Sequence, residues 1–156
     1  MRKIVQFAVC IVVFAFSAFA AYASANDVRK AERIAASRQF AMPSMRLVRA
    51  LMQVESECGV TSANILQIAR IYVRDVNRIY GTKFSHRDVT DIDSAVEMTR
   101  LYLAYYGRIY ELRTGLDCTD EIFARMHNGG PKGYKKWRTK QYWKKVKKVL
   151  KMRDFK

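Results

Sequence analysis

Glu55 has the setting in this 156-residue chain that best suits acid–base chemistry. It follows an apolar stripe at helical spacing and precedes a turn at Gly59, so we expect it at the end of a buried helix. A carboxyl in a half-apolar place has its charged form disfavoured, which raises its pKa and lets it hold a proton near neutral pH. The pattern predicts a general acid; the alternative is a surface charge at a helix end, and Glu57 has no apolar run directly before it.

Two further segments carry polar groups in settings where they could contact a ligand. Asn128 begins the turn Asn128-Gly129-Gly130-Pro131, where its amide could hold a sugar hydroxyl or N-acetyl group and the glycines permit close backbone approach. As structure alone, the turn is a helix stop. Gln67 lies among apolar neighbours, so its amide must be satisfied either by a core hydrogen bond or by substrate.

Other chemistries lack the residues they need. The three cysteines form no CxxC pair, which excludes a zinc ribbon or a thioredoxin-like site. No cluster has metal-ligand spacing, no Gly-rich phosphate loop follows a strand, and His86 stands in a polar loop where it is expected on the surface. We therefore expect neither a metal nor a cofactor.

The elements that must position these residues are helices. Helical spacing predicts segments from Pro43 to Glu55 and over 28–40, 65–79, 94–112, 120–126 and 139 onward. Ser94 and Glu97 fit a capping box, Gly107 could interrupt the fourth of these helices, and Gly129-Gly130-Pro131 should end the next. No strand run or repeat stands out. The prediction is one mostly α domain over 43–156, after a helical extension at 26–42.

Residues 1–25 have the pattern of a signal peptide. Arg2 and Lys3 precede an apolar run, and Ala23-Ser24-Ala25 fits a cleavage site; a retained membrane anchor is the alternative. Either way the protein is expected to be exported, to the periplasm or outside the cell, with association with the envelope as a further option. Cys58 and Cys118 would then lie in an oxidising compartment, where they form either a disulfide or two buried thiols.

Positive charge is concentrated at the C-terminal end. The chain has 29 Lys and Arg against 14 Asp and Glu, a net charge of +15, and residues 132–156 hold 12 of the basic residues and one acid. Such a segment is either a solvated helix face or a surface that gathers anionic wall polymer or lipid headgroups. Export argues against nucleic acid as the partner.

Several of these motifs together resemble a known family. Glu55-Ser56, Ile65-Leu66-Gln67-Ile68, Tyr102-Leu103 and His127-Asn128-Gly129-Gly130-Pro131 occur in the order seen in lysozyme-like lytic transglycosylases of the SLT type. The stretch from Ala124 to Tyr134, continuing to Tyr142-Trp143-Lys144-Lys145-Val146, is also similar to the ending of invertebrate-type lysozymes. The resemblance covers residues 43–150 and implies a mostly α, lysozyme-like fold with a groove for peptidoglycan strands.

The resemblance also implies a chemistry. Glu55 matches the catalytic acid that protonates the bond between N-acetylmuramic acid and N-acetylglucosamine and then deprotonates the muramyl 6-hydroxyl, closing an anhydro ring. Ser56, Gln67, Tyr102, His127 and Asn128 match substrate-binding positions, although His127 replaces the transglycosylase tyrosine and could serve only to cap a helix.

One departure from the pattern bears on the reaction type. A hydrolase needs a second carboxylate, which invertebrate-type lysozymes place shortly before their Gln segment, and residues 59–64 contain no acid. Lytic transglycosylase is therefore the predicted activity. The alternatives are a muramidase that uses Asp75, Asp88, Asp91 or Asp93, and a non-catalytic protein that binds glycan or anionic surfaces with the same fold.

Overall fold

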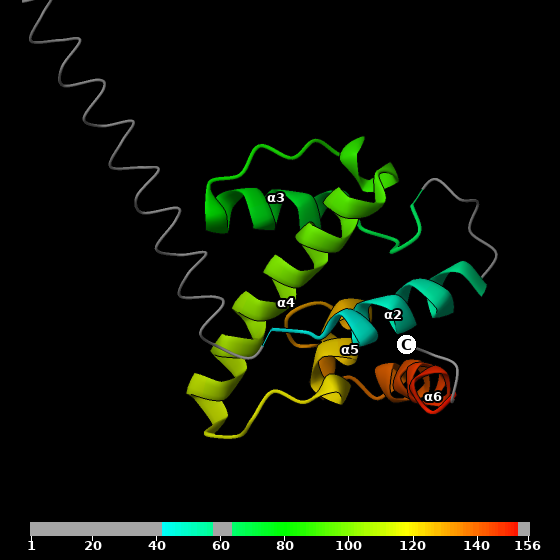
Figure 1. Ribbon diagram of the computed structural model, residues 1–156. Coiled ribbons are helices and arrows are strands. Elements are labelled where there is room, and N and C mark those ends of the chain that lie inside the picture. The colour runs from blue at the N-terminus through cyan, green and yellow to red at the C-terminus, as the bar shows by residue number, and fades with distance from the viewer. Residues whose placement is uncertain (1–41, 58–63, 153–156) are drawn as a thin grey trace, which may run out of the picture. The chain divides into compact units, whose positions relative to one another are not determined.

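The computed structural model describes residues 42–57 and 64–152, and their regular structure is entirely helical (Figure 1). The mostly α prediction is thereby confirmed. The signal peptide at 1–25, the extension at 26–42 except its last residue, and Cys58 lie outside the described residues. In chain order the elements are α2 (Met45–Glu57), α3 (Arg70–Tyr80), the 3-10 turn η1 (Asp88–Thr90), α4 (Ile92–Thr114), α5 (Asp120–Gly129), the 3-10 turn η2 (Gly133–Lys135) and α6 (Arg138–Leu150).

The long helix α4 connects two groups of elements. α3 and η1 pack on its first half, and α5 packs on its second half (Figure 1). α2, α5 and α6 form a second group, in which α6 packs on both of the others. Its core is fully buried and apolar, with Leu47, Leu51, Val54, Met126 and Val146 each no more than 1% exposed. Burial of each such side chain stabilises the fold by about 2 kcal/mol.

The segment before α3 is a turn, so the prediction of a helix starting at Ile65 was wrong. The side chain of Asn64 bonds the backbone of Ile68 twice: its Nδ2 donates to the Ile68 carbonyl at 3.0 Å, and its Oδ1 accepts from the Ile68 N–H at 2.8 Å. Gln67 within this turn has φ of 48°, a left-handed conformation that no helix accommodates. The local polar bonds outweigh the helical spacing of the apolar residues, and the helix begins only at Arg70.

Helix α4 also departs from the predicted details. Its N-cap is Asp91, whose carboxylate accepts from the Ser94 N–H, so Ser94 lies inside the first turn and the predicted capping box was wrong. Gly107 does not interrupt the helix. A Cβ there would lie 2.6 Å from a ring carbon of Phe123, so glycine allows α5 to approach α4 closely. Gly115, in the left-handed conformation, ends the helix after Thr114.

Helix α5 runs through Gly129, three residues beyond the predicted end, and a buried polar network fixes the chain beyond it. The Nε of Arg125 donates to the Thr139 hydroxyl at 3.1 Å, which in turn donates to the Gly133 carbonyl at 2.8 Å. Arg125 and Thr139 are 7% and 0% exposed. These bonds tie η2 and the start of α6 to the turn of α5 that precedes His127.

Gly133 is the tightest point of this arrangement, and its replacement should destabilise the protein. A Cβ at Gly133 would overlap the carbonyl oxygen of Arg125, a backbone atom that cannot move without shifting α5. We expect Gly133→Ala to lower the free energy of unfolding by about 3 kcal/mol or more, as overpacking of a rigid site does. At Gly115 an added Cβ meets open space. Gly115→Ala should therefore lower the free energy of unfolding only by the strain of a non-glycine residue in the left-handed conformation, about 1 kcal/mol. Urea unfolding measures both, and equal losses would contradict the packing of η2 on α5.

Candidate functional site

Glu55 lies near the end of α2 and is buried although it is ionisable, with 6% of its surface exposed. Burial raises the pKa of its carboxyl, while a hydrogen bond with the Tyr142 side chain and the positive charge of Lys145 act in the opposite direction. Both opposing groups come from α6. The predicted setting of a carboxyl held in a half-apolar place is therefore what the geometry supplies.

His127 on α5 faces the same carboxyl. Its Nε2 lies 3.8 Å from Oε1 of Glu55, and its side chain is 3% exposed. Burial lowers the pKa of the imidazole to about 4, and a hydrogen bond with the Leu66 backbone raises it by less. Since 3.8 Å exceeds a hydrogen-bond length and the ring is neutral above about pH 4, the contact is not an ion pair near neutral pH.

One of the two ring nitrogens of His127 has no hydrogen-bond partner among the described residues. Nδ1 of His127 is buried and accepts or donates no hydrogen bond among the residues that the structure describes. Leaving such an atom unpaired costs about 1–3 kcal/mol. A stability cost retained beside an acidic carboxyl is typical of a functional site.

A row of aromatic rings leads from this pair across α3 and α4. The rings of His127 and Tyr72 lie edge to face with centroids 6.0 Å apart, Tyr72 stacks on Tyr102 at 3.6 Å, and Tyr102 contacts Tyr106 at 4.6 Å. Tyr72 and Tyr102 are 7% and 4% exposed. Tyr102, predicted to bind substrate, is thus a buried residue of the row, and its ring packs against the rings of Tyr72 and Tyr106.

Gln67 approaches Glu55 from the turn before α3. Its backbone is the one non-glycine with a positive φ in the described ranges 42–57 and 64–152, and its Nε2 donates to the Glu55 carbonyl at 3.3 Å. The residue is otherwise exposed. Strained backbone of this kind concentrates at ligand sites, and here it directs an exposed amide to the end of α2.

The remaining predicted site residues lie less centrally. Ser56 is exposed and its hydroxyl donates to the Gln53 carbonyl of its own helix at 2.8 Å. Asn128 is exposed on α5, next to His127. Cys118 is buried beside Gly107 and forms no disulfide with another described residue; because Cys58 lies outside the described residues, the disulfide between the two stays a prediction. The structure therefore brings Glu55, His127 and Gln67 together and leaves Ser56 and Asn128 at the surface.

Tyr142 and Lys145 are the site residues that sequence reasoning missed. They lie one turn apart on α6, and both act on the Glu55 carboxyl. Tyr142 lies on the packing face of this helix, since the residue is 8% exposed. The signal that could have identified it was the Tyr142-Trp143 pair in the stretch similar to the ending of invertebrate-type lysozymes.

The aspartates that could supply a second carboxylate have other structural roles or lie exposed. Asp75 accepts from the Tyr106 hydroxyl at 2.8 Å and pairs with Arg78 at 3.2 Å. Asp88 accepts from the backbone of Ser85 at 2.7 Å, and Asp91 caps α4. Asp93 is exposed in the first turn of that helix. No cluster of three or more histidine, cysteine or acidic side chains suited to a metal ion occurs among the described residues.

Comparison with known proteins gives a relationship that agrees with this arrangement. Lysozyme 1 of Crassostrea virginica is 32% identical over 114 residues, which cover 67% of this chain and 59% of that protein. The lysozyme of Ostrea edulis is 34% identical over 87 residues, covering 55% of this chain and 58% of that protein. The chain is similar to lysozymes.

The similarity covers only part of each lysozyme. The chain spans less than two thirds of the length of either lysozyme. No protein-family model matches it. The lysozyme-like part of the resemblance is thus supported by two relatives, and the SLT transglycosylase part stays a prediction. No described helix is long and apolar enough to span a bilayer.

Removing the Tyr142 hydroxyl should shift the pH profile of any activity that depends on protonated Glu55. The hydrogen bond with Tyr142 lowers the pKa of this carboxyl, so Tyr142→Phe should raise it further. We expect the basic limb of the kcat/KM profile to move up by about one pH unit, since such a bond is worth about 1 kcal/mol. Tyr105→Phe on α4 is the matched control. An unmoved limb in Tyr142→Phe would contradict the proposed contact.

The buried neutral histidine should make the fold sensitive to acid. Between its ordinary pKa of 6.5 and the folded value of about 4, the unfolded chain takes up a proton that the folded chain does not, so stability falls as pH falls. The full effect is about 3 kcal/mol. The raised pKa of Glu55 has the opposite effect on stability, because the folded chain binds a proton at this carboxyl more readily than the unfolded chain does, so a fall in pH favours the folded state.

Urea unfolding at pH 7 and pH 4.5 should therefore show a loss in the wild type that His127→Gln lacks. His86, in a half-exposed position, is present in both proteins and serves as a constant background. If the variant lost as much stability as the wild type over this range, the acid sensitivity would come from another group.

Proposed function

We propose that this protein is an exported glycosidase that cleaves peptidoglycan between N-acetylmuramic acid and N-acetylglucosamine, with Glu55 as the general acid. The observation that carries the proposal is the buried Glu55 carboxyl, whose raised pKa suits a proton donor. Similarity to two lysozymes supports the substrate class.

In the proposed reaction the Glu55 carboxyl donates its proton to the glycosidic oxygen as the bond to C1 of the muramyl sugar breaks. The Tyr142 side chain faces the carboxyl from α6 and lowers its pKa, and the neutral ring of His127 adds no charge that would hold the carboxyl ionised. The Glu55 carboxylate then takes the proton of the muramyl 6-hydroxyl while the oxygen of that hydroxyl bonds to C1 of the same sugar. This step closes the 1,6-anhydro ring and returns the carboxyl to its acid form.

Lytic transglycosylase chemistry is favoured because it uses one carboxylate twice. Asp75, Asp88 and Asp91 are committed to other bonds, and residues 59–64 contain no acid. A lysozyme-type hydrolase is the second candidate, and the specific observation in its favour is that both relatives are named lysozymes. It would require a base that activates water in place of the 6-hydroxyl.

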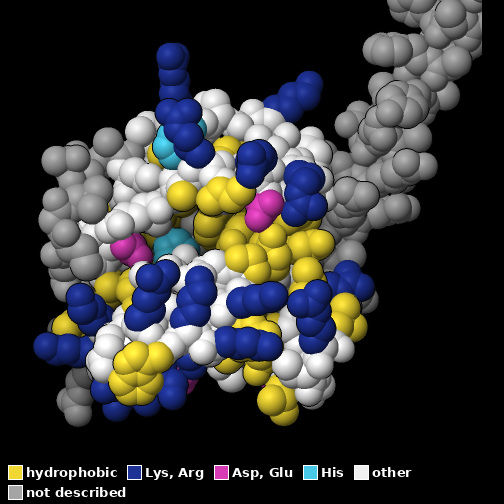
Figure 2. Space-filling view, turned by 180° about the vertical axis from the view of Figure 1, so that it is seen from behind, with side chains coloured by type: hydrophobic (Ala, Val, Ile, Leu, Met, Phe, Trp, Pro, Cys, Tyr) yellow, Lys and Arg dark blue, Asp and Glu magenta, His cyan; other side chains and the backbone are white. Residues whose placement is uncertain are grey.

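The basic surface would hold the enzyme on its substrate. Lys and Arg side chains gather over the lower part of the face in Figure 2, with few acidic side chains among them. Tyr142, Val146 and Val149 of α6 are buried against the domain, whereas the lysines of that helix are exposed, namely Lys140, Lys144, Lys145, Lys147 and Lys148. The burial of these apolar residues supports packing of α6 on the domain. The exposed lysines leave its positive charge available to an anionic wall or membrane surface.

Replacing the acid should abolish cleavage and leave binding intact. Glu55→Gln keeps the shape of the side chain and removes the transferable proton, so we expect the rate of muropeptide release from sacculi to fall by about a thousandfold. Glu97→Gln, an exposed position on α4, is the control and should retain activity. Wild-type activity in Glu55→Gln would place the acid elsewhere.

Mass spectrometry of the released fragments separates the candidate reactions. A 1,6-anhydro end identifies the transglycosylase, and a hydrated reducing end identifies the hydrolase. If the wild type sediments with sacculi and releases nothing, the protein is a binding protein and the proposal of catalysis fails.

A further inference from the structure

The net positive charge of the described residues comes entirely from one segment. Residues 132–152, which include η2 and α6, contain ten Lys and Arg and no Asp or Glu. The other described residues, 42–57 and 64–131, contain eleven basic and eleven acidic side chains, so their charges cancel. Such an asymmetric distribution of charge turns the side that carries this segment toward an anionic partner.

The exposed side of α6 arranges part of this charge in a straight stripe. Thr139, Tyr142, Val146 and Val149 are buried against the domain, so the opposite side of the helix faces outward. Side chains three and four residues apart lie next to one another on a helix. The outward stripe defined by these spacings consists of exposed residues only, namely Trp137, Lys140, Lys144, Lys148 and Lys151. None of the ion pairs among the described residues involves a lysine of this stripe.

Trp137 forms the first position of the stripe and differs from the others in being aromatic. Its side chain is 71% exposed, and the Nζ of Lys140 lies 5.4 Å from the centre of its ring. Indole rings are enriched where a membrane meets water, because the apolar ring and the polar N–H group suit the two sides of that boundary. The stripe therefore combines a row of cations with a side chain that favours the interface of a bilayer.

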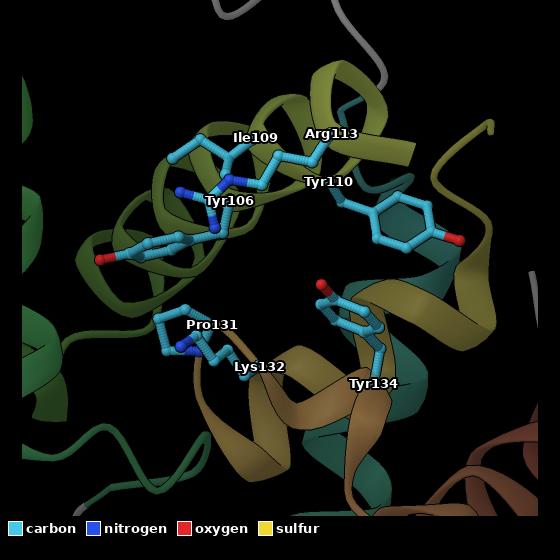
Figure 3. A pocket seen from close by; sticks show the side chains of 7 residues that line it. All are labelled: Tyr106, Ile109, Tyr110, Arg113, Pro131, Lys132 and Tyr134. Carbon is cyan, nitrogen blue, oxygen red and sulfur yellow. The ribbon is translucent and has the colours of Figure 1, made fainter. Parts of the chain in front are cut away.

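The segment that carries Trp137 is fixed to the rest of the domain. Tyr134 of η2 and Tyr110 of α4 face each other edge to face, with ring centroids 4.9 Å apart (Figure 3). The Nη2 of Arg125 donates to the carbonyl of Lys136, the residue directly before the indole, at 3.3 Å. Because the backbone on this side of Trp137 is already ordered, little conformational entropy is lost when the ring binds a partner.

We propose that this stripe docks the protein on a bilayer that contains anionic lipids, with the lysines at the headgroup phosphates and the Trp137 ring inserted at the interface. Of a wall polymer and a membrane, the membrane fits better, because the stripe is the outward side of a single helix, whereas a polymer strand is held in a groove. The apolar side of α6 stays in the core of the domain, so the helix lies on the bilayer and does not enter it. The docking does not depend on the proposed cleavage of peptidoglycan.

The fluorescence of Trp137 tests the proposal at the stripe itself. Trp143→Phe removes the other tryptophan of the chain, so that the emission reports Trp137 alone. The exported form of this variant would be titrated with vesicles of phosphatidylglycerol and phosphatidylcholine, and separately with phosphatidylcholine alone. We expect the anionic vesicles to shift the emission to shorter wavelength and to protect the ring from quenching by acrylamide, and the neutral vesicles to do neither. Sedimentation of the exported wild type with the same vesicles measures the affinity independently of Trp143→Phe.

Replacing residues of the stripe should weaken this affinity. The triple variant Lys140→Gln/Lys144→Gln/Lys148→Gln should bind anionic vesicles about a hundredfold more weakly, because each lysine near such a surface adds to the attraction. Trp137→Ala, measured by sedimentation, should weaken binding about tenfold and leave its dependence on salt unchanged, since the indole contributes apolar contact and no charge.

Two matched controls change other exposed positions. Arg74→Gln/Lys83→Gln/Arg87→Gln removes as many exposed charges from α3 and the loop that follows it, and Leu112→Ala removes a side chain that is also 71% exposed. Both should bind nearly as tightly as the wild type, because charges farther from the membrane are screened by salt. Equal binding to neutral and anionic vesicles, a bound state in which Trp137 stays open to acrylamide, or equal weakening by the two triple variants would each overturn the proposal. Purified sacculi or duplex DNA that protected Trp137 as well as anionic vesicles do would also overturn it, by assigning the stripe to a polymer.

Discussion

The burial of one carboxyl among three helices is the constraint on which the candidate site depends. Glu55 ends up away from water only because α2 packs on α6 and α5, and each of these helices then contributes a group that acts on it or faces it. Tyr142 comes from α6 and His127 from α5. The apolar contacts that hold the bundle together therefore also set the protonation of its acid, so packing and chemistry cannot be changed independently here.

The overall architecture could be predicted from the sequence because it depends on long apolar patterns. The stripe ending at Glu55 and the amphipathic pattern after Thr139 gave helices close to those observed. The errors occur where a short polar contact competes with a longer pattern. Asn64 bonds Ile68 and delays α3, and Asp91 accepts from Ser94 and starts α4 earlier. Periodicity contains no information about which of two local polar bonds forms.

The candidate site was predictable in part for the same reason. The setting of Glu55 results from the apolar run before it, whereas the nearness of His127 depends on how α5 packs, which spacing along the chain does not encode. Tyr142 was missed because a tyrosine on the apolar face of a helix looks like a packing residue, and only its position next to Glu55 shows that its side chain also affects the carboxyl.

The turn at Asn64 has a consequence for the candidate site. Its side chain performs, through two bonds to Ile68, the closure that a longer stretch of backbone would otherwise provide. The Gln67 amide therefore reaches the end of α2 from a turn that is closed by the side chain of one of its own residues.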